Sequence, residues 1–340
     1  MGRRKYLVAA AVLLLAAVGA VVLAARTSPS SVGGASAAGN GSSAPPLKAK
    51  GWINTSALTP ARLRRKVVLY DFWTYSCVNC VRTIPYLRAW YDRYRSDGLV
   101  VIGVHSPEFD FEKNHANVRR AVKKLGVDYP VALDDDMTIW NQFGNQYWPA
   151  DYLFDRSNHQ AEVHFGEGGY TETENEIRKL LGVPASAPRA VLGRREGGTD
   201  GPSDITPETY NGSERGAAGF ASPQSLVDGT QVFTAPAVLP TNSHAFTGAW
   251  TVTPEYVQSA VPGSSILLRY VAGQVNLVMA TSHGQPIDVS VQVDNRPASV
   301  VRVHASDLYA LVTDPTDGTH TLRLTAQAPG LRAYAFTFGG

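Results

Sequence analysis

Hydrophobic residues in the first half of the chain fall into short continuous runs separated by amphipathic segments. The runs Val67–Trp73 and 99–104 are almost wholly apolar, as strands buried on both faces are. Between them, over Val78–Tyr94, apolar residues recur every three or four positions, which predicts an amphipathic helix. A basic amphipathic helix is predicted over 114–125, with Gly126 as its C-cap. Strands that alternate with helices predict an α/β fold, a central sheet covered on both faces.

Shorter elements complete this part of the chain. The pattern predicts a strand over 129–133, a helix over 137–144, and a hairpin of strands over 151–154 and 162–165. A last helix stops at Gly182. Thr171 and Glu174 have the spacing of a capping box at its start.

The hydrophobic period changes to two in the second half of the chain. Ile287, Val289 and Val291 alternate with polar residues, and the same alternation returns near the C-terminus. Turn residues recur at short intervals and no helical pattern intervenes, so we predict an all-β domain, a β-sandwich of jelly-roll type. The stretch 184–219 is rich in proline and glycine and is predicted to be a linker, within which 206–210 is suited to docking on a domain.

The N-terminus has the pattern of a targeting segment. Arg3, Arg4 and Lys5 precede an uncharged apolar run over 6–25, long enough to span a bilayer of ~30 Å. We favour an uncleaved single-span anchor in the cell membrane, with the rest of the chain extracytoplasmic. The alternative is a cleaved signal and a secreted protein, since a small-residue site lies at 35–37.

These patterns divide the chain into five predicted parts. They are a signal anchor or signal peptide (1–25), a flexible linker (26–50), the α/β domain (51–183), a second linker (184–219) and the β-sandwich (220–340). A chain of 340 residues is long enough for two domains. The net charge of +2 and the lack of lysine after Lys179 exclude an extended phosphate-binding surface, so no nucleic-acid partner is predicted.

Both cysteines of the chain lie in one tetrapeptide, Cys77-Val78-Asn79-Cys80, between a predicted strand and a predicted helix. Backbone N–H groups at a helix N-terminus stabilise a thiolate, and the second thiol lies one turn further in. The position therefore indicates redox chemistry by a Cys77–Cys80 disulfide, with no other cofactor. A purely structural local disulfide is the alternative. A metal site is not predicted, because the scattered histidines supply no second ligand pair.

The residues around the dithiol resemble the thioredoxin active site. Asp71-Phe72-Trp73 precedes Cys77-x-x-Cys80, Pro85 lies within the helix, and Trp148-Pro149 precedes a strand, where thioredoxin-like proteins carry a cis-proline. The resemblance implies that Cys77 attacks a substrate disulfide, Cys80 resolves the mixed disulfide and Asp71 accepts the Cys80 proton. It also implies that Trp148 and Pro149 bind substrate, with Trp73 counted among the substrate-binding residues.

A finer resemblance extends over both domains. The strings 71–80, 104–109 and 147–150 are similar to the extracytoplasmic redoxin of DipZ-type thiol-disulfide interchange proteins, which is followed by a carbohydrate-binding-module-like β-sandwich. It implies an exported, membrane-tethered thiol-disulfide oxidoreductase that reduces disulfides of exported proteins. A separate membrane electron donor is implied as well, because this chain has a single apolar span. Glu108 resembles the acidic residue of membrane-tethered redoxins, although a solvated loop glutamate is an equal alternative.

Two other functions remain open from the sequence. Thr74 lies three residues before Cys77, as in peroxiredoxins, although Tyr70 lies where their proline would be, so a thiol peroxidase is one alternative. The other is a surface protein that binds cell-surface glycan through its sandwich and carries a secondary redox domain. Its sugar-stacking platform would comprise four aromatic residues that are otherwise core candidates: Trp250, Tyr256, Tyr270 and Tyr309.

Overall fold

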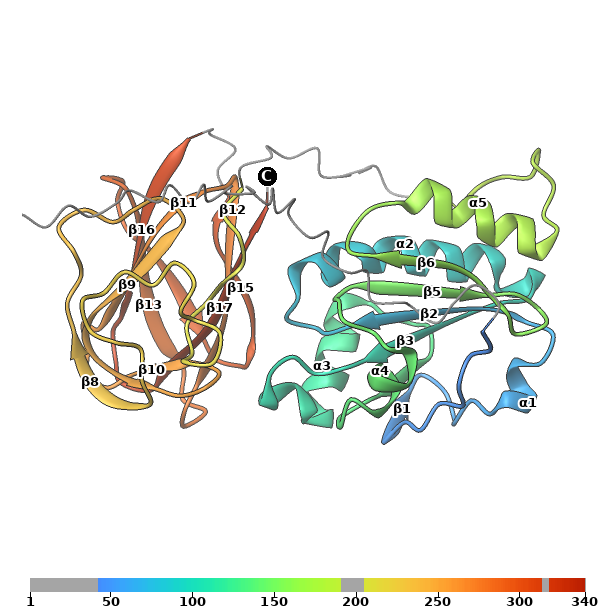
Figure 1. Ribbon diagram of the computed structural model, residues 1–340, viewed down its shortest axis with the longest axis horizontal. Helices are drawn as coiled ribbons and strands as arrows, with labels where there is room; N and C mark the ends of the chain where they lie inside the picture. The colour runs from blue at the N-terminus through green and yellow to red at the C-terminus, as the bar shows by residue number, and fades with distance from the viewer. Residues whose placement is uncertain (1–41, 191–204, 314–317, 340) are drawn as a thin grey trace, which may run out of the picture. The chain divides into compact units, whose positions relative to one another are not determined.

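A six-stranded mixed sheet forms the first domain in the computed structural model, which describes residues 42–190, 205–313 and 318–339 (Figure 1). The strand order is β1-β4-β3-β2-β5-β6, with β2, β3 and β4 parallel and the others antiparallel to their neighbours. The strands are β1 (Gly51–Ile53), β2 (Val67–Trp73), β3 (Leu99–His105), β4 (Val131–Leu133), β5 (Ala150–Phe154) and β6 (Gln160–Phe165).

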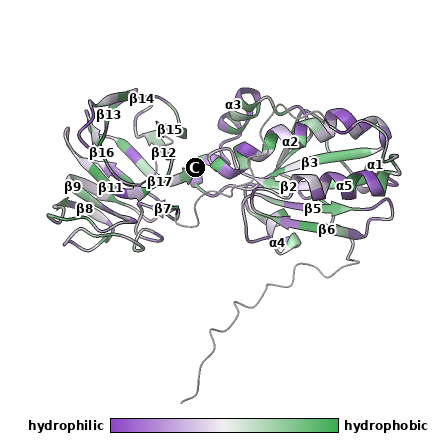
Figure 2. Ribbon diagram, turned by 90° about the horizontal axis from the view of Figure 1, so that it is seen from above, coloured by the Kyte–Doolittle hydropathy of each residue, from purple (hydrophilic) through white to green (hydrophobic). Residues whose placement is uncertain are grey.

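Helices cover both faces of this sheet because its central strands are apolar on both sides. Alternate residues of β2 pack on one face against the long helix α2 and against α3 and α5, and on the other face against α4. Figure 2 shows the hydrophobic character of β3 between helices that carry hydrophilic residues. The helices are α1 (Pro60–Leu63), α2 (Val78–Tyr94), α3 (His115–Leu125), α4 (Thr138–Phe143) and α5 (Tyr170–Leu181), with 3₁₀ turns at Arg95–Asp97 and Asp110–Lys113. The predicted α/β fold is confirmed.

An eleven-stranded antiparallel sheet forms the second domain, which confirms the all-β prediction. The strands follow one nearly barrel-like path, β14-β13-β16-β11-β9-β10-β17-β12-β15, with β7 on β17 and β8 on β9. They are β7 (Thr209–Tyr210), β8 (Gly229–Phe233), β9 (Ser243–Val252), β10 (Val257–Ser259), β11 (Ser265–Val271), β12 (Gln274–Thr281), β13 (Ile287–Val293), β14 (Ser299–Val303), β15 (Asp307–Thr313), β16 (Thr319–Ala326) and β17 (Leu331–Gly339).

Strand β9 joins the two halves of this path. Its first residues pair with β11 and its last residues pair with β10 and β8. The change occurs at Gly248, whose φ of 82° lies in the left-handed region that favours glycine. A Cβ built there would lie 3.1 Å from Ser264 Cα. The change of pairing partner along β9 therefore depends on a residue that has no side chain.

One detail differs from the sequence analysis. The capping box is wrong, because Gly169 is the N-cap of α5 and Thr171 already lies inside the helix. Glu174 is instead buried, where it accepts hydrogen bonds from the Tyr94 hydroxyl and the Ala190 backbone N–H.

The predicted anchor lies outside the described residues, and no helix within 42–190, 205–313 or 318–339 is long and apolar enough to cross a membrane.

The described residues of both domains belong to one compact unit. The loop after β3 packs on the second domain, where the rings of Phe109 and Phe111 lie with centroids 5.1 and 4.9 Å from that of Tyr334. Thr209–Tyr210 pairs with β17, so the 206–210 segment docks on the second domain as expected. A short loop of the first domain is therefore buried by the second.

Replacing Gly248 by alanine should destabilise the second domain. We expect a loss of about 1–3 kcal/mol in the free energy of unfolding, from the left-handed backbone and the contact with Ser264. Urea denaturation measures it. Gly284→Ala is the control, since Gly284 has φ 68° but no atom within 4 Å of an added Cβ. Equal losses in the two variants would contradict a role for the Ser264 contact.

Candidate active site

The two cysteines lie at the start of α2, directly after the central strand β2. Cys77 is the N-cap residue, and its sulfur accepts a hydrogen bond from the Cys80 backbone N–H at 3.3 Å. Cys77 is half-buried whereas Cys80 is buried, and both are free thiols in this structure. A backbone N–H in the first turn of a helix that donates to a sulfur favours negative charge on it. One accessible and one protected sulfur is the arrangement that attack followed by resolution requires.

The environment of Cys80 opposes ionisation of its thiol. Burial, together with the hydrogen bond and charge of Cys77, raises the pKa of Cys80 well above its ordinary value. Asp71 lies close enough for its charge to contribute in the same direction. Its side chain is 1% exposed and neither carboxyl oxygen has a hydrogen-bond partner among the described residues. Burial and the charge of Asp151 raise the pKa of Asp71. A carboxyl that binds protons this readily suits the predicted role of proton acceptor.

Asp151 is a residue that the sequence analysis missed. It lies directly opposite Asp71 across β2 and β5, on the same face of the sheet. Burial and the charge of Glu162 raise the pKa of Asp151 to about 7. The signal available in the sequence was an aspartate two residues after Pro149, in a strand that is otherwise buried. Only the register of β2 and β5 makes it a neighbour of Asp71.

Glu112 is a second residue that the sequence analysis missed. Its buried carboxylate accepts hydrogen bonds from the Ser76 hydroxyl and from the backbone N–H groups of Glu108 and Phe109. Burial raises the pKa of Glu112 to about 7. The carboxylate thus joins the segment just before Cys77 to the loop after β3. No local pattern in the sequence indicated this link.

The peptide bond between Trp148 and Pro149 is cis, as the resemblance implied. The Trp148 indole donates a hydrogen bond to the Ser106 carbonyl at 3.0 Å, and its ring lies 4.1 Å from that of Trp140. These contacts fix the side chain beside the dithiol. Both Cys77 and Trp148 line the same cleft, so the structure brings these predicted site residues together.

Trp73 and Thr74 are placed differently. Trp73 is wholly buried in the core against His105, so its prediction as a substrate-binding residue is wrong. The reason is periodicity, since Trp73 points to the same inner face as Leu69 and Asp71. Thr74 is also buried, and its hydroxyl lies 3.5 Å from the His105 imidazole. A hydroxyl in that position cannot contact a peroxide in the cleft.

Glu108 is held by the second domain. Arg215 donates to its carboxylate at 2.8 Å and the Tyr210 hydroxyl donates to it at the same distance. The Glu108 side chain is 8% exposed, so the alternative of a solvated loop glutamate is wrong. The Arg215 guanidinium also lies 3.8 Å from the Tyr210 ring centroid, a cation–π contact. The acidic residue that the sequence placed near the dithiol is thus neutralised by Arg215, which lies between β7 and β8.

A cleft of about 350 Å³ lies at the dithiol, and both domains form its walls. The first domain supplies Cys77, Val78, Asn79, Glu108, Gln146, Tyr147 and Trp148, and the second supplies Thr206, Glu208, Tyr210, Thr337 and Phe338. The second domain therefore limits what can reach the Cys77 sulfur.

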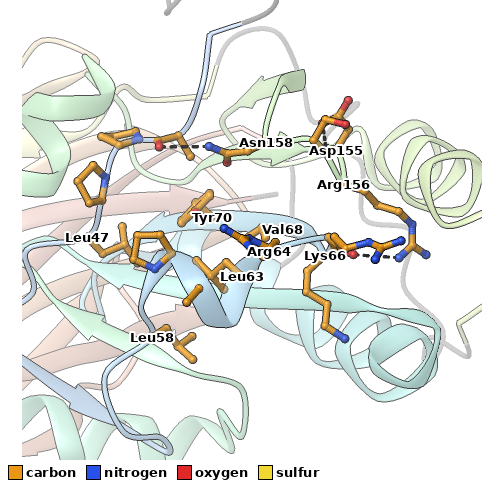
Figure 3. Close-up of a pocket in the computed structure, with 17 residues that line it drawn as sticks. Leu47, Leu58, Leu63, Arg64, Lys66, Val68, Tyr70, Asp155, Arg156 and Asn158 are labelled. Carbon is orange, nitrogen blue, oxygen red and sulfur yellow. Dashed lines mark hydrogen bonds between the residues drawn. The ribbon is translucent and has the colours of Figure 1, made fainter.

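A larger cavity of about 640 Å³ lies elsewhere in the first domain (Figure 3). Figure 3 shows Val68 and Tyr70, from the beginning of β2, beside Leu63 and Arg64. The hairpin residues Asp155 and Asn158 close another side. It shares no lining residue with the cleft at the dithiol, so it is not part of the candidate active site.

The four aromatic residues of the alternative sugar-stacking platform lie in different places in the second domain. Trp250 and Tyr270 are fully buried in its core, where aromatic side chains contribute to packing. Tyr256 lies against Tyr334, and the Tyr309 hydroxyl donates to the backbone of its own turn at Ala305. The four rings do not form one surface. In the described part of the chain, no three histidine, cysteine or acidic residues cluster as metal ligands would.

Replacing Asp151 by asparagine should change how stability depends on pH. The pKa of Asp151 is raised from 3.8 to about 7, so the folded protein binds more protons than the unfolded chain between these values. Its contribution to stability therefore falls as the pH rises through that range. We expect the stability of Asp151→Asn relative to wild type to increase by on the order of 2–4 kcal/mol between about pH 4 and pH 8.

Denaturant unfolding at several pH values measures this difference. Asp128→Asn is the matched control, because that side chain is about half exposed. A difference for Asp151→Asn that does not vary with pH would contradict a raised pKa of Asp151.

Each of the two domains matches a known protein family. Residues 40–161 match the Redoxin family, and residues 206–339 match the family described as thioredoxin like C-terminal domain. Over 316 residues, 87% of this chain, the sequence is 35% identical to Protein DipZ of Mycobacterium bovis and of Mycobacterium tuberculosis. That match covers 43% of DipZ, so the chain spans less than half the length of these relatives.

Other matches are shorter. Thiol-disulfide oxidoreductase YkuV of Bacillus subtilis is 26% identical over 132 residues, 39% of this chain and 88% of the relative. A crystal structure of a thioredoxin-like superfamily protein covers 43% of this chain and 99% of its own, at 24% identity and a TM-score of 0.39. On the family matches and the DipZ alignment, the chain is a DipZ homologue that joins a redoxin domain of thioredoxin-like fold to a thioredoxin-like C-terminal domain.

Proposed function

We propose that this protein is a thiol-disulfide oxidoreductase that reduces disulfides of exported proteins through Cys77 and Cys80. The observation that carries the proposal is the pair of thiols at the start of α2, with one sulfur facing a cleft and the other buried one turn behind it. The DipZ alignment and relatives named thiol-disulfide oxidoreductase support the same chemistry.

The reaction divides between the two sulfurs. The Cys77 thiolate attacks a substrate disulfide, forms a mixed disulfide and releases the first substrate thiolate. Cys80 then loses its proton to Asp71 and attacks the Cys77 sulfur, which forms the Cys77–Cys80 disulfide and releases the second substrate thiolate. Two electrons pass from the enzyme to the substrate. A dithiol reductant must return them before the next cycle, and we propose a separate membrane protein as its source.

The cleft restricts the form of the substrate. Its walls come from both domains, so a disulfide must enter on a chain segment thin enough to pass Tyr147 and Phe338. An extended segment placed along Trp148 and Pro149 meets this condition. We therefore propose substrates whose disulfides lie in exposed or unfolded segments. The described part of the second domain does not offer the predicted platform for glycan, because two of the four candidate sugar-stacking rings, Trp250 and Tyr270, are in the core.

The proposed location rests on the sequence of the N-terminus. A basic cluster before an apolar run of twenty residues is typical of a membrane anchor with the following domains outside the cytoplasm. Disulfides persist in such compartments, so substrates are present there.

Replacing Cys80 by serine should trap the substrate. The mixed disulfide on Cys77 cannot be resolved without the second sulfur, and it accumulates as a covalent complex. We expect Cys80→Ser to form reducible adducts with a reporter peptide that contains one disulfide in an extended segment, seen by non-reducing electrophoresis and mass spectrometry. Cys77→Ser is the control and should form none. Adducts at Cys80 in that control, or none in either variant, would rule out the assigned roles.

The reduction potential of the dithiol decides the direction of the reaction. For a reductase we expect about −270 mV, the value of thioredoxin. Equilibration of the protein from residue 42 onward with dithiothreitol buffers, followed by tryptophan fluorescence, measures it. A potential near about −120 mV would make the protein an oxidant of exported thiols, contrary to the proposal.

A further inference from the structure

Three titratable residues lie side by side on adjacent strands behind the dithiol. Asp71 of β2 faces Asp151 of β5, and Asp151 faces His164 of β6. Residues directly opposite in antiparallel strands point to the same face, with Cβ atoms about 4.5–5.5 Å apart. The strand order places β6 at the edge of the sheet. The three side chains therefore form a row from the centre of the sheet to its edge.

The row begins beside the buried sulfur. Leu69 and Trp73 of β2 pack with Cys80 of α2 in one core, and Asp71 lies between them on the same face. Asp71 is also close enough to influence the pKa of Cys80. Cys80 has little access to solvent, so a proton that leaves it must cross protein first.

The polar atoms of the row lack protein partners. Both carboxyl oxygens of Asp71, Oδ1 of Asp151 and Nε2 of His164 are buried with no hydrogen-bond partner in the described part of the chain. Asp71 is 1% and Asp151 is 6% exposed. Structural carboxyls at such positions are normally hydrogen-bonded, because an unpaired buried polar group is costly. Unpartnered groups in a row suit the exchange of protons better than they suit packing.

We propose that Asp71, Asp151 and His164 carry the Cys80 proton from the dithiol to the edge of the sheet. Asp71 takes the proton from the Cys80 sulfur as this attacks Cys77. Asp71 and Asp151 act as one carboxyl pair that holds a shared proton, and a second proton passes on to His164, which is half-buried. Asp151 and His164 act through Asp71, so they are positioning residues. The inference deepens the proposed function and depends on its dithiol chemistry.

The pair shares a proton because two facing carboxylates in a dry core repel each other. The pKa of each carboxyl is raised by burial first and by a neighbouring acid second, Asp151 for Asp71 and Glu162 for Asp151. The titratable groups around them are Cys80 from α2, Tyr129 from the segment before β4, and Glu162 and His164 from β6. None of these is a lysine or arginine that would keep the carboxyls ionised.

The first test follows the carboxyl pair itself. In protein labelled with ¹³C at aspartate side chains, we expect Asp71 to titrate in two steps, coupled to Asp151. In Asp151→Asn it should titrate in one step, at a pH lower by about one unit or more. Asp128→Asn is the matched control and should leave the Asp71 titration unchanged. An Asp71 titration that is the same in wild type and Asp151→Asn would overturn the pair.

The second test follows the resolving step. The reduced enzyme reacts with 5,5′-dithiobis(2-nitrobenzoate): Cys77 releases one thionitrobenzoate, then Cys80 displaces the second. The rate of the second thionitrobenzoate release depends on pH and has a midpoint. In Asp151→Asn we expect this midpoint to fall by the same number of pH units as the Asp71 titration seen by NMR. An unchanged midpoint would overturn the role of Asp151. Failure to release the second thionitrobenzoate in wild type would instead count against the proposed function, and the NMR titration would still report on the pair.

The third test follows the exit of the proton. In weakly buffered solution a pH indicator reports proton release during the same reaction. In wild type we expect it to coincide with the second thionitrobenzoate release. In His164→Gln both the second thionitrobenzoate release and the proton release should be slower than in wild type, and imidazole in the solution should restore both. Releases as fast in His164→Gln as in wild type, or slow releases that imidazole does not restore, would overturn His164 as the exit.

Discussion

Strand β2 lies between β3 and β5, and its side chains pack against helices on both faces of the sheet. This double burial holds the strand in one position, because neither face can move without exposing apolar surface to water. The dithiol follows at its carboxyl end, where the chain turns into α2. The positions of Cys77, of Asp71 two strand residues behind the turn, and of the facing strand β5 all depend on this one packed strand.

The same burial gives the acidic groups of the core their chemistry. A carboxyl in a dry core is costly, and two that face each other are more so, because each disfavours ionisation of the other. The first domain carries this cost at Asp71 and Asp151, directly behind Cys80. Proteins commonly give up stability at functional positions, and the cost here lies beside the Cys80 thiol, whose pKa the charge of Asp71 helps to raise.

The loop after β3 connects the dithiol to the second domain. From inside, the Glu112 carboxylate binds Ser76 and the loop backbone. From outside, Arg215 and Tyr210 bind Glu108, and Tyr334 packs against Phe109. The second domain thereby becomes a wall of the cleft. Its contribution to the site comes from residues 206–215 and from β17. Two of the four aromatic residues that the sequence suggested, Trp250 and Tyr270, are inside its core.

The sequence by itself determined the local elements and the dithiol. The apolar run of β2, the period of α2 with Cys77 at its N-cap, and the proline after Trp148 are patterns of neighbouring residues, which act through short-range sterics and hydrogen bonds. Only the tertiary structure decided that Asp151 faces Asp71, that Glu112 lies under Ser76 and that Arg215 neutralises Glu108. Those contacts join residues 36 to 107 positions apart, and they depend on strand register and domain docking. The packing of whole faces sets both, and no single pattern along the chain encodes them.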